Sequence, residues 1–206
     1  MTKIKICGIK TVEDALAAME AGADLIGFNF YPKSPRYIDV GRCRDIMSVM
    51  RKYGHVKYVA VFVNSSAEEI YATMDTCGLA LAQLHGDEPA DMLNALEGKA
   101  FKAFRGIPSD VTGYIRIESP TLLVDAAVKG VYGGSGVTAD WSVASELAKK
   151  YPLLLAGGLT PENVADAVRQ VRPWGVDVAS GVESEPGKKD AAKISAFVKA
   201  VREVEK

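Results

Sequence analysis

Short apolar segments alternate with longer amphipathic segments along almost the whole chain. Eight apolar segments have the length and β-branched content of strands. They cover residues 3–7, 25–30, 58–63, 81–84, 100–104, 121–125, 153–156 and 176–179. Because strands that are buried on both faces read as nearly continuous hydrophobic runs, these segments predict a parallel sheet.

Residues typical of helix termini lie between the predicted strands. Thr11 and Ser66 each precede an amphipathic segment and are expected to serve as N-caps. Thr160 is followed by a proline and an acidic residue, which predicts a third N-cap at Thr160. Gly22 and Gly78 fall where helices are expected to end.

The alternation predicts an α/β fold, a single (β/α)8 TIM barrel that forms one domain over residues 1–206. Residues 109–117 give the weakest pattern, and we expect a short fifth helix there. A doubly wound open sheet is the competing architecture. Against it, no GxGxxG motif follows the first predicted strand.

Composition narrows the range of partners. The formal net charge of −1 comes from acidic and basic residues mixed throughout, so no basic stripe for nucleic acid is expected. No apolar run approaches the length of a membrane span, and the charged N-terminus does not resemble a signal peptide. The three cysteines are far apart, which argues against disulfides and zinc and favours the reducing cytoplasm.

Two small glycine-containing segments follow the last two predicted strands. Gly157 and Gly158 come after the seventh, and Ser180 and Gly181 come after the eighth. Crowded backbone N–H groups without bulky side chains can bind an anion, and (β/α)8 barrels commonly hold a phosphate between these two loops. We therefore expect a small phosphorylated ligand.

Four other residues fall at the carboxyl ends of predicted strands or in the loops that follow, where barrel active sites lie. Cys7 is a candidate base or nucleophile, or else a buried structural cysteine. Asp125 ends an apolar run and is a candidate general acid, or else a turn cap. Arg36 can bind a carboxylate or lie in solvent, and His85 can contact a ligand or only the backbone.

A glycine-rich segment, residues 132–136, follows the strand that ends in Asp125. It can cover the site or provide further phosphate donors through Gly134, and the alternative is a plain linker.

In their order and spacing, these motifs resemble the phosphoribosylanthranilate isomerase family from one end of the chain to the other. The matching blocks are KICGI (5–9), SPRY (34–37), QLHG (83–86), VD (124–125), GGSG (133–136), LAGGL (155–159) and GVDVASGVE (175–183). The resemblance implies a (β/α)8 barrel without metal or organic cofactor. It also implies an acid/base Amadori rearrangement of N-(5-phosphoribosyl)anthranilate in tryptophan biosynthesis.

The resemblance also assigns roles to residues. Cys7 corresponds to the family's general base, Asp125 to its general acid and Arg36 to the group that binds the anthranilate carboxylate. The phosphate is expected on the N–H groups of residues 157, 158, 180 and 181. Two departures concern phosphate contacts and loop closure: Val137 stands where a lysine is frequent, and Ala179 where a serine is frequent. As in its relatives, a monomer or homodimer is expected.

Three alternatives remain at this point. A bifunctional relative uses two aspartates where this chain has Cys7 and Asp125. A phosphate-binding lyase needs a catalytic lysine or a metal-binding acidic set, and no lysine ends the first, fourth or sixth predicted strand. A non-catalytic phosphosugar-binding barrel keeps the glycine segments and has no need of the acid and base.

Overall fold

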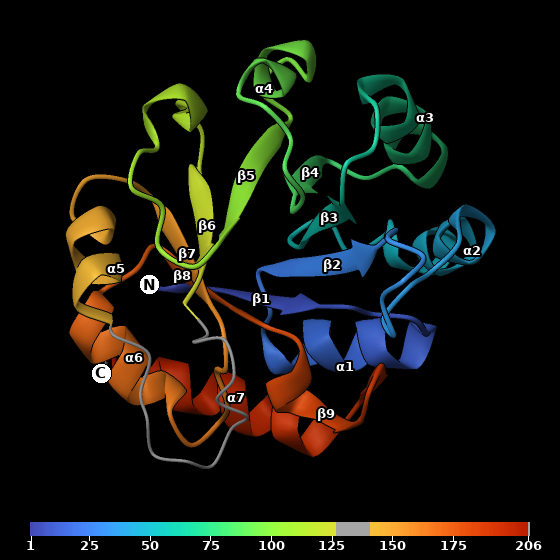
Figure 1. Cartoon of the computed structure of the whole chain (residues 1–206). Helices are drawn as coiled ribbons and strands as arrows, with labels where there is room; N and C mark the ends of the chain where they lie inside the picture. The colour runs from blue at the N-terminus through green and yellow to red at the C-terminus, as the bar shows by residue number, and fades with distance from the viewer. Residues whose placement is uncertain (127–140, 206) are drawn as a thin grey trace.

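Eight parallel strands close into a barrel in the computed structural model, which describes residues 1–126 and 141–205 (Figure 1). The strands pair in sequence order, and β1 also pairs with β8, which closes the ring. They are β1 (Lys3–Cys7), β2 (Leu25–Asn29), β3 (Lys57–Phe62), β4 (Leu81–Leu84), β5 (Ala100–Arg105), β6 (Leu122–Asp125), β7 (Leu153–Ala156) and β8 (Gly175–Val178). The predicted TIM barrel is thus confirmed, and each strand bound lies within one residue of the expected one.

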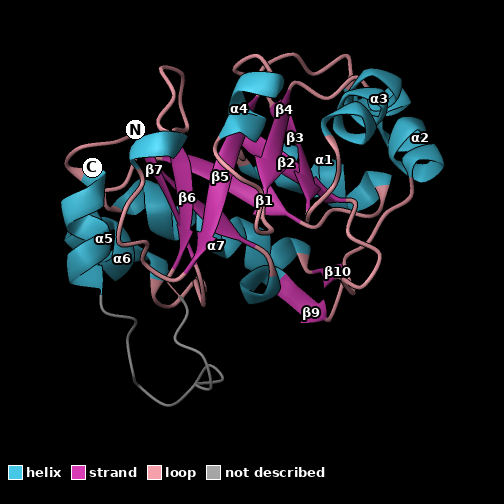
Figure 2. Ribbon diagram, turned by 45° about the horizontal axis from the view of Figure 1, so that its top comes forward, coloured by secondary structure: helices cyan, strands magenta, loops and turns pink. Residues whose placement is uncertain are grey.

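Helices surround the barrel on its outside (Figures 1 and 2). They are α1 (Val12–Ala21), α2 (Val40–Met50), α3 (Ala67–Cys77), α4 (Asp91–Ala95), α5 (Trp141–Ala148), α6 (Val164–Val171) and α7 (Ala191–Glu203). Two short 3₁₀ helices, η1 (Thr112–Tyr114) and η2 (Ser180–Val182), lie in loops. A small antiparallel pair, β9 (Glu183–Glu185) and β10 (Lys188–Lys189), follows η2.

The apolar residues form two packed layers. The larger layer lies between the strands and the helices, and the smaller one fills the barrel interior. Leu25, Val59, Leu123 and Leu154 belong to the interior layer and are almost fully buried. Because side chains alternate along a strand, the residues two positions later also face the barrel interior, at its carboxyl end. This alternation places the polar residues of the site.

Several expected helix ends are confirmed. The Thr11 side chain accepts a hydrogen bond from Asp14 N and caps α1, and Ser66 forms a reciprocal capping box with Glu69 at α3. Gly22 and Gly78 end these helices in the left-handed conformation.

Two helix expectations were wrong. Helix α6 begins at Val164 with Asn163 as N-cap, so Thr160 is not the cap. The Asn163 side chain instead joins Thr160 N and Gly158 O, which forms a turn before the helix.

The helix expected over residues 109–117 is only the single turn η1. Asp110 accepts hydrogen bonds from both the backbone N–H and the hydroxyl of Thr112, so this side chain stabilises a local turn. Nearby Gly113 and β-branched residues also disfavour a longer helix.

Candidate active site

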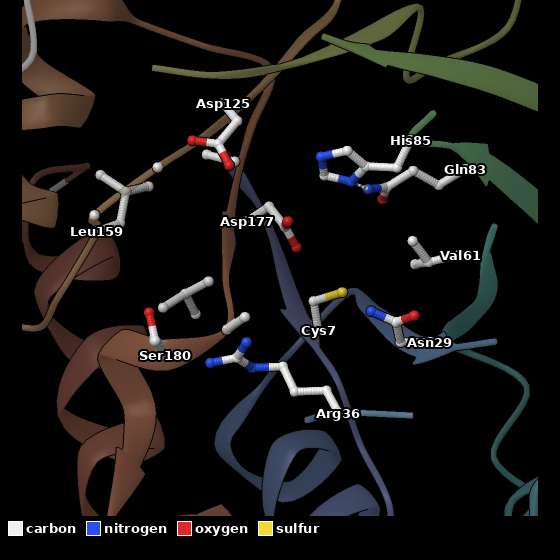
Figure 3. A pocket seen from close by; sticks show the side chains of 15 residues that line it. Cys7, Asn29, Arg36, Val61, Gln83, His85, Asp125, Leu159, Asp177 and Ser180 are labelled. Carbon is white, nitrogen blue, oxygen red and sulfur yellow. Dashed lines mark hydrogen bonds between the residues drawn. The ribbon is translucent and has the colours of Figure 1, made fainter. Parts of the chain in front are cut away.

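A cavity of about 250 Å³ opens at the carboxyl ends of the strands. Cys7 from β1, Asp125 from β6, His85 after β4 and Arg36 after β2 all line it (Figure 3). These residues come from distant parts of the sequence, and the barrel brings their side chains to one space. The thiol and the carboxyl predicted to act on one ligand therefore share a cavity.

The predicted phosphate-binding residues divide into three groups. Gly157, Gly158 and Ser180 line the same cavity as Cys7. Gly181 does not line it, because its backbone packs against the loop after β7, where an added Cβ would lie 1.9 Å from Leu159 O. Gly134 lies outside the described residues, as do the rest of the 132–136 segment and Val137.

The loops after β7 and β8 have distinctive backbone conformations beside the cavity. Gly157 and Gly158 have φ values of 100° and 64°, and residues other than glycine rarely adopt this left-handed conformation. Helix η2 begins at Ser180, so N–H groups at its first turn lack partners within the helix. Both loops border the cavity.

His85 presents a neutral imidazole to the cavity. Burial lowers the pKa of His85, although the nearby carboxylates of Asp177 and Asp125 oppose this effect. Gln83 Nε2, which can only donate, lies 3.0 Å from His85 Nδ1. In the tautomer that accepts this hydrogen bond at Nδ1, the ring proton is on Nε2, and His85 can donate from that nitrogen.

Arg36 is fixed by a carboxylate of the protein. Its Nε and Nη2 each donate to Glu183 over 2.7 Å, and Lys189 Nζ donates to the same carboxylate over 2.8 Å. The carboxylate bonds raise the pKa of Arg36 and outweigh its partial burial, so the guanidinium stays charged beside the cavity. Glu183 and Lys189 belong to the β9–β10 pair, whose Gly187 packs closely against Pro35 O.

Sequence reasoning missed several residues of the site. Asn29, Gln83 and Asp177 also line the cavity, and each faces inward in the same alternating pattern as Cys7. The Oε1 atom of Gln83 is buried and has no hydrogen-bond partner in the described part of the chain. The sequence did contain a signal for these three residues. Each is a polar residue within an otherwise apolar strand and lies two positions from a residue that faces the barrel interior.

No group of three or more His, Cys, Asp or Glu side chains suited to a metal ion occurs within residues 1–126 and 141–205. None of the helices in the same ranges combines the length and hydropathy needed to cross a membrane.

Comparison with known proteins identifies the family. A family model described as N-(5'-phosphoribosyl)anthranilate isomerase matches residues 4–200. A relative of that name from Geotalea uraniireducens is 46% identical over 205 residues, which cover 98% of this chain and 99% of the relative. The chain belongs to this family. Its activity is therefore the isomerisation of N-(5'-phosphoribosyl)anthranilate, in tryptophan biosynthesis.

Solved structures of the isomerase family share the whole fold. Phosphoribosyl anthranilate isomerase from Thermotoga maritima has a TM-score of 0.86 and 39% identity, and 98% of this chain covers 100% of it. A structure described as monomers of the dimeric T. maritima enzyme has a TM-score of 0.84, 37% identity and coverages of 98% and 99%. Another is a complex with reduced 1-(o-carboxyphenylamino)-1-deoxyribulose 5-phosphate, with a TM-score of 0.82, 37% identity and coverages of 98% and 100%.

Proposed function

We propose that Cys7 and Asp125 carry out the isomerisation as general base and general acid. Asp125 donates a proton to the ribose ring oxygen of N-(5'-phosphoribosyl)anthranilate, and the C1–O bond breaks to give an open-chain imine. Cys7, as a thiolate, then removes the proton on C2 of the protonated imine, which gives an enolamine. The enolamine tautomerises: C1 takes up a proton while the C2 hydroxyl loses one, and the product is the aminoketose. The proposed steps are proton transfers between side chains and substrate, and they call on no cofactor.

The single observation that carries this proposal is the shared cavity. Cys7 and Asp125 enter it from β1 and β6, strands that are separated by β7 and β8 around the ring. A furanose bound between them can be protonated by Asp125 from one side and deprotonated by Cys7 from the other.

The remaining side chains bind the ends of the substrate in this proposal. The phosphate lies on the N–H groups around Gly157, Gly158, Ser180 and Gly181. Arg36 binds the anthranilate carboxylate through the nitrogen of its guanidinium that does not donate to Glu183. His85 donates from Nε2 to a substrate oxygen. The 132–136 segment, with Gly134, remains a proposed contributor to phosphate binding.

The fluorescence of the anthranilate group supplies the assay. With purified protein and substrate, we expect the substrate signal to be lost at enzymatic rates. Cys7→Ala and Asp125→Ala should each lower kcat by about 10²–10⁴-fold, the usual contribution of an acid or base, while circular dichroism stays unchanged. Wild-type kcat in either variant would remove that residue from the mechanism. Binding without turnover by the wild-type protein would favour a phosphosugar-binding barrel instead.

We further propose that residues 1–206 act as one domain, because the first and last barrel strands pair with each other. The working form is a monomer or homodimer. We place the reaction in the cytoplasm, since Cys7, Cys43 and Cys77 are all free thiols.

A further inference from the structure

Lys5 is a charged residue in the middle of the barrel, and the mechanism above does not use it. Its exposed fraction is 0%, and it is among the largest fully buried side chains of the described residues. Lys5 lies two positions before Cys7 in β1, so both side chains point into the barrel interior. A lysine is rarely buried without a specific partner. Lys5 Nζ donates to Asp177 Oδ1 over 2.8 Å, and Asp177 is its register partner on β8.

The Lys5 ammonium also lies near the sulfur of Cys7, which acts on its charge. Both atoms point to the space above Gly27, the register partner of Cys7 on β2. A Cβ added to Gly27 would lie 2.9 Å from Cys7 Sγ and 3.1 Å from Lys5 Nζ. Glycine at this position therefore leaves room for both the sulfur and the ammonium.

The electrostatic balance keeps the Lys5 ammonium charged. Burial lowers the pKa of Lys5, but the Asp177 carboxylate and the Cys7 sulfur outweigh burial, and the pKa stays above its ordinary value. A charge inside the barrel is poorly screened by water, so its effect on a neighbouring atom is larger than at the surface. Opposite charges within about 4–6 Å commonly favour the ionised form of a group by 1–3 pH units.

We infer that Lys5 is a positioning residue whose buried ammonium supports negative charge on the Cys7 sulfur. This inference rests on the proposed role of Cys7 as base, because a thiolate is the form that can accept a proton. Asp177 completes the arrangement, since its carboxylate anchors the ammonium from the β8 side.

Other charged groups also surround Cys7 and must be held constant in a test. Arg36 and Lys189 are cations whose charges interact with Cys7. Both also bind the carboxylate of Glu183. Lys5 differs from both because it stands on β1, the strand that carries Cys7, and is paired with Asp177 instead of Glu183. Among the described residues, His85 and Asp125 also line the cavity, from the β4 and β6 sides.

The test measures alkylation of Cys7 by iodoacetamide against pH, with peptide mass spectrometry to identify the modified cysteine. The test variant is the double substitution Lys5→Met/Asp177→Asn, and its reference is Asp177→Asn alone. Asp177 is replaced in both proteins so that removal of the ammonium does not leave a buried carboxylate unpaired. Loss of the ammonium should slow alkylation at pH 7 at least about tenfold and displace the curve to higher pH. Cys43 and Cys77 serve as internal controls, because burial raises the pKa of both thiols and both are fully buried.

Gly27→Ala provides a second variant that keeps all three ionisable groups. Its methyl group separates the sulfur from the ammonium, so its curve should be displaced in the same direction as that of the double variant. If the double variant does not fold, this result decides alone. Superimposable curves for each variant and its reference would overturn the inference. Alkylation of Cys7 does not require turnover. Unchanged alkylation curves would therefore refute the role of Lys5, whereas wild-type kcat in Cys7→Ala would refute the role of Cys7 as base.

Discussion

Glu183 offers the most direct test of how this site is held together. Its side chain is 4% exposed, and it binds Lys189, which is 1% exposed, and Arg36, which is 22% exposed. Glu183→Gln preserves the shape but removes the negative charge between the two cations. Removing one partner of a buried ion pair typically costs about 3–5 kcal/mol, because the remaining charge is left uncompensated. We expect a loss of that size in the free energy of unfolding.

Urea denaturation followed by circular dichroism measures this loss. With a slope of about 2–3 kcal/mol/M, the midpoint should fall by about 1–2.5 M. Glu185→Gln is the matched control on the same hairpin. Its ion pair with Lys188 is 3.2 Å long and both side chains are largely exposed, so its removal should change stability by less than about 1 kcal/mol. Equal midpoints for the two variants would refute the reasoning.

The stability difference between wild type and Glu183→Gln depends on pH. Burial by itself raises the pKa of Glu183, but hydrogen bonds from Arg36 and Lys189 outweigh it and hold the pKa below its ordinary value of 4.5. The stabilisation is therefore fully present above that value and is lost as the pH falls through the lower pKa of the folded protein. The stability difference between wild type and Glu183→Gln should close in acid, and a difference that grows there would contradict this cause.

Two further substitutions test the backbone around the site. Gly181→Ala should destabilise the protein by about 1–3 kcal/mol or more, because the new Cβ would overlap Leu159 O. Gly54→Ala is the control and should be nearly neutral, since its Cβ would meet nothing within 4 Å. Thermal unfolding of the two variants measures the difference. Ser66→Ala should cost about 1 kcal/mol through loss of the α3 capping box, measured by urea denaturation, and an unchanged midpoint would show that the cap contributes nothing.

The strands and the positions of the proposed acid and base could be read from the sequence for a local reason. A parallel strand covered on both faces needs a continuous apolar run, and such runs are visible without knowledge of their partners. Cys7 and Asp125 stand at the ends of two of these runs. Since parallel strands in a barrel end on the same face, their meeting followed from the fold class.

The helix errors arise where a side chain has a choice of hydrogen-bond partners. Asn163 forms hydrogen bonds before α6 and thereby moves the helix start away from Thr160. Asp110 stabilises a turn where a helix was expected. These choices depend on competing hydrogen bonds of similar energy, which a pattern of apolar positions does not rank.

By itself, the sequence determined the order of strands and helices, the barrel, and the residues at the strand ends that face one cavity. Only the tertiary structure decided which charges meet. Lys5 pairs with Asp177 across 172 positions, and Arg36 pairs with Glu183 across 147. The physical reason is that a buried charge needs a partner close in space, and only closure of the barrel and the β9–β10 hairpin bring these partners together.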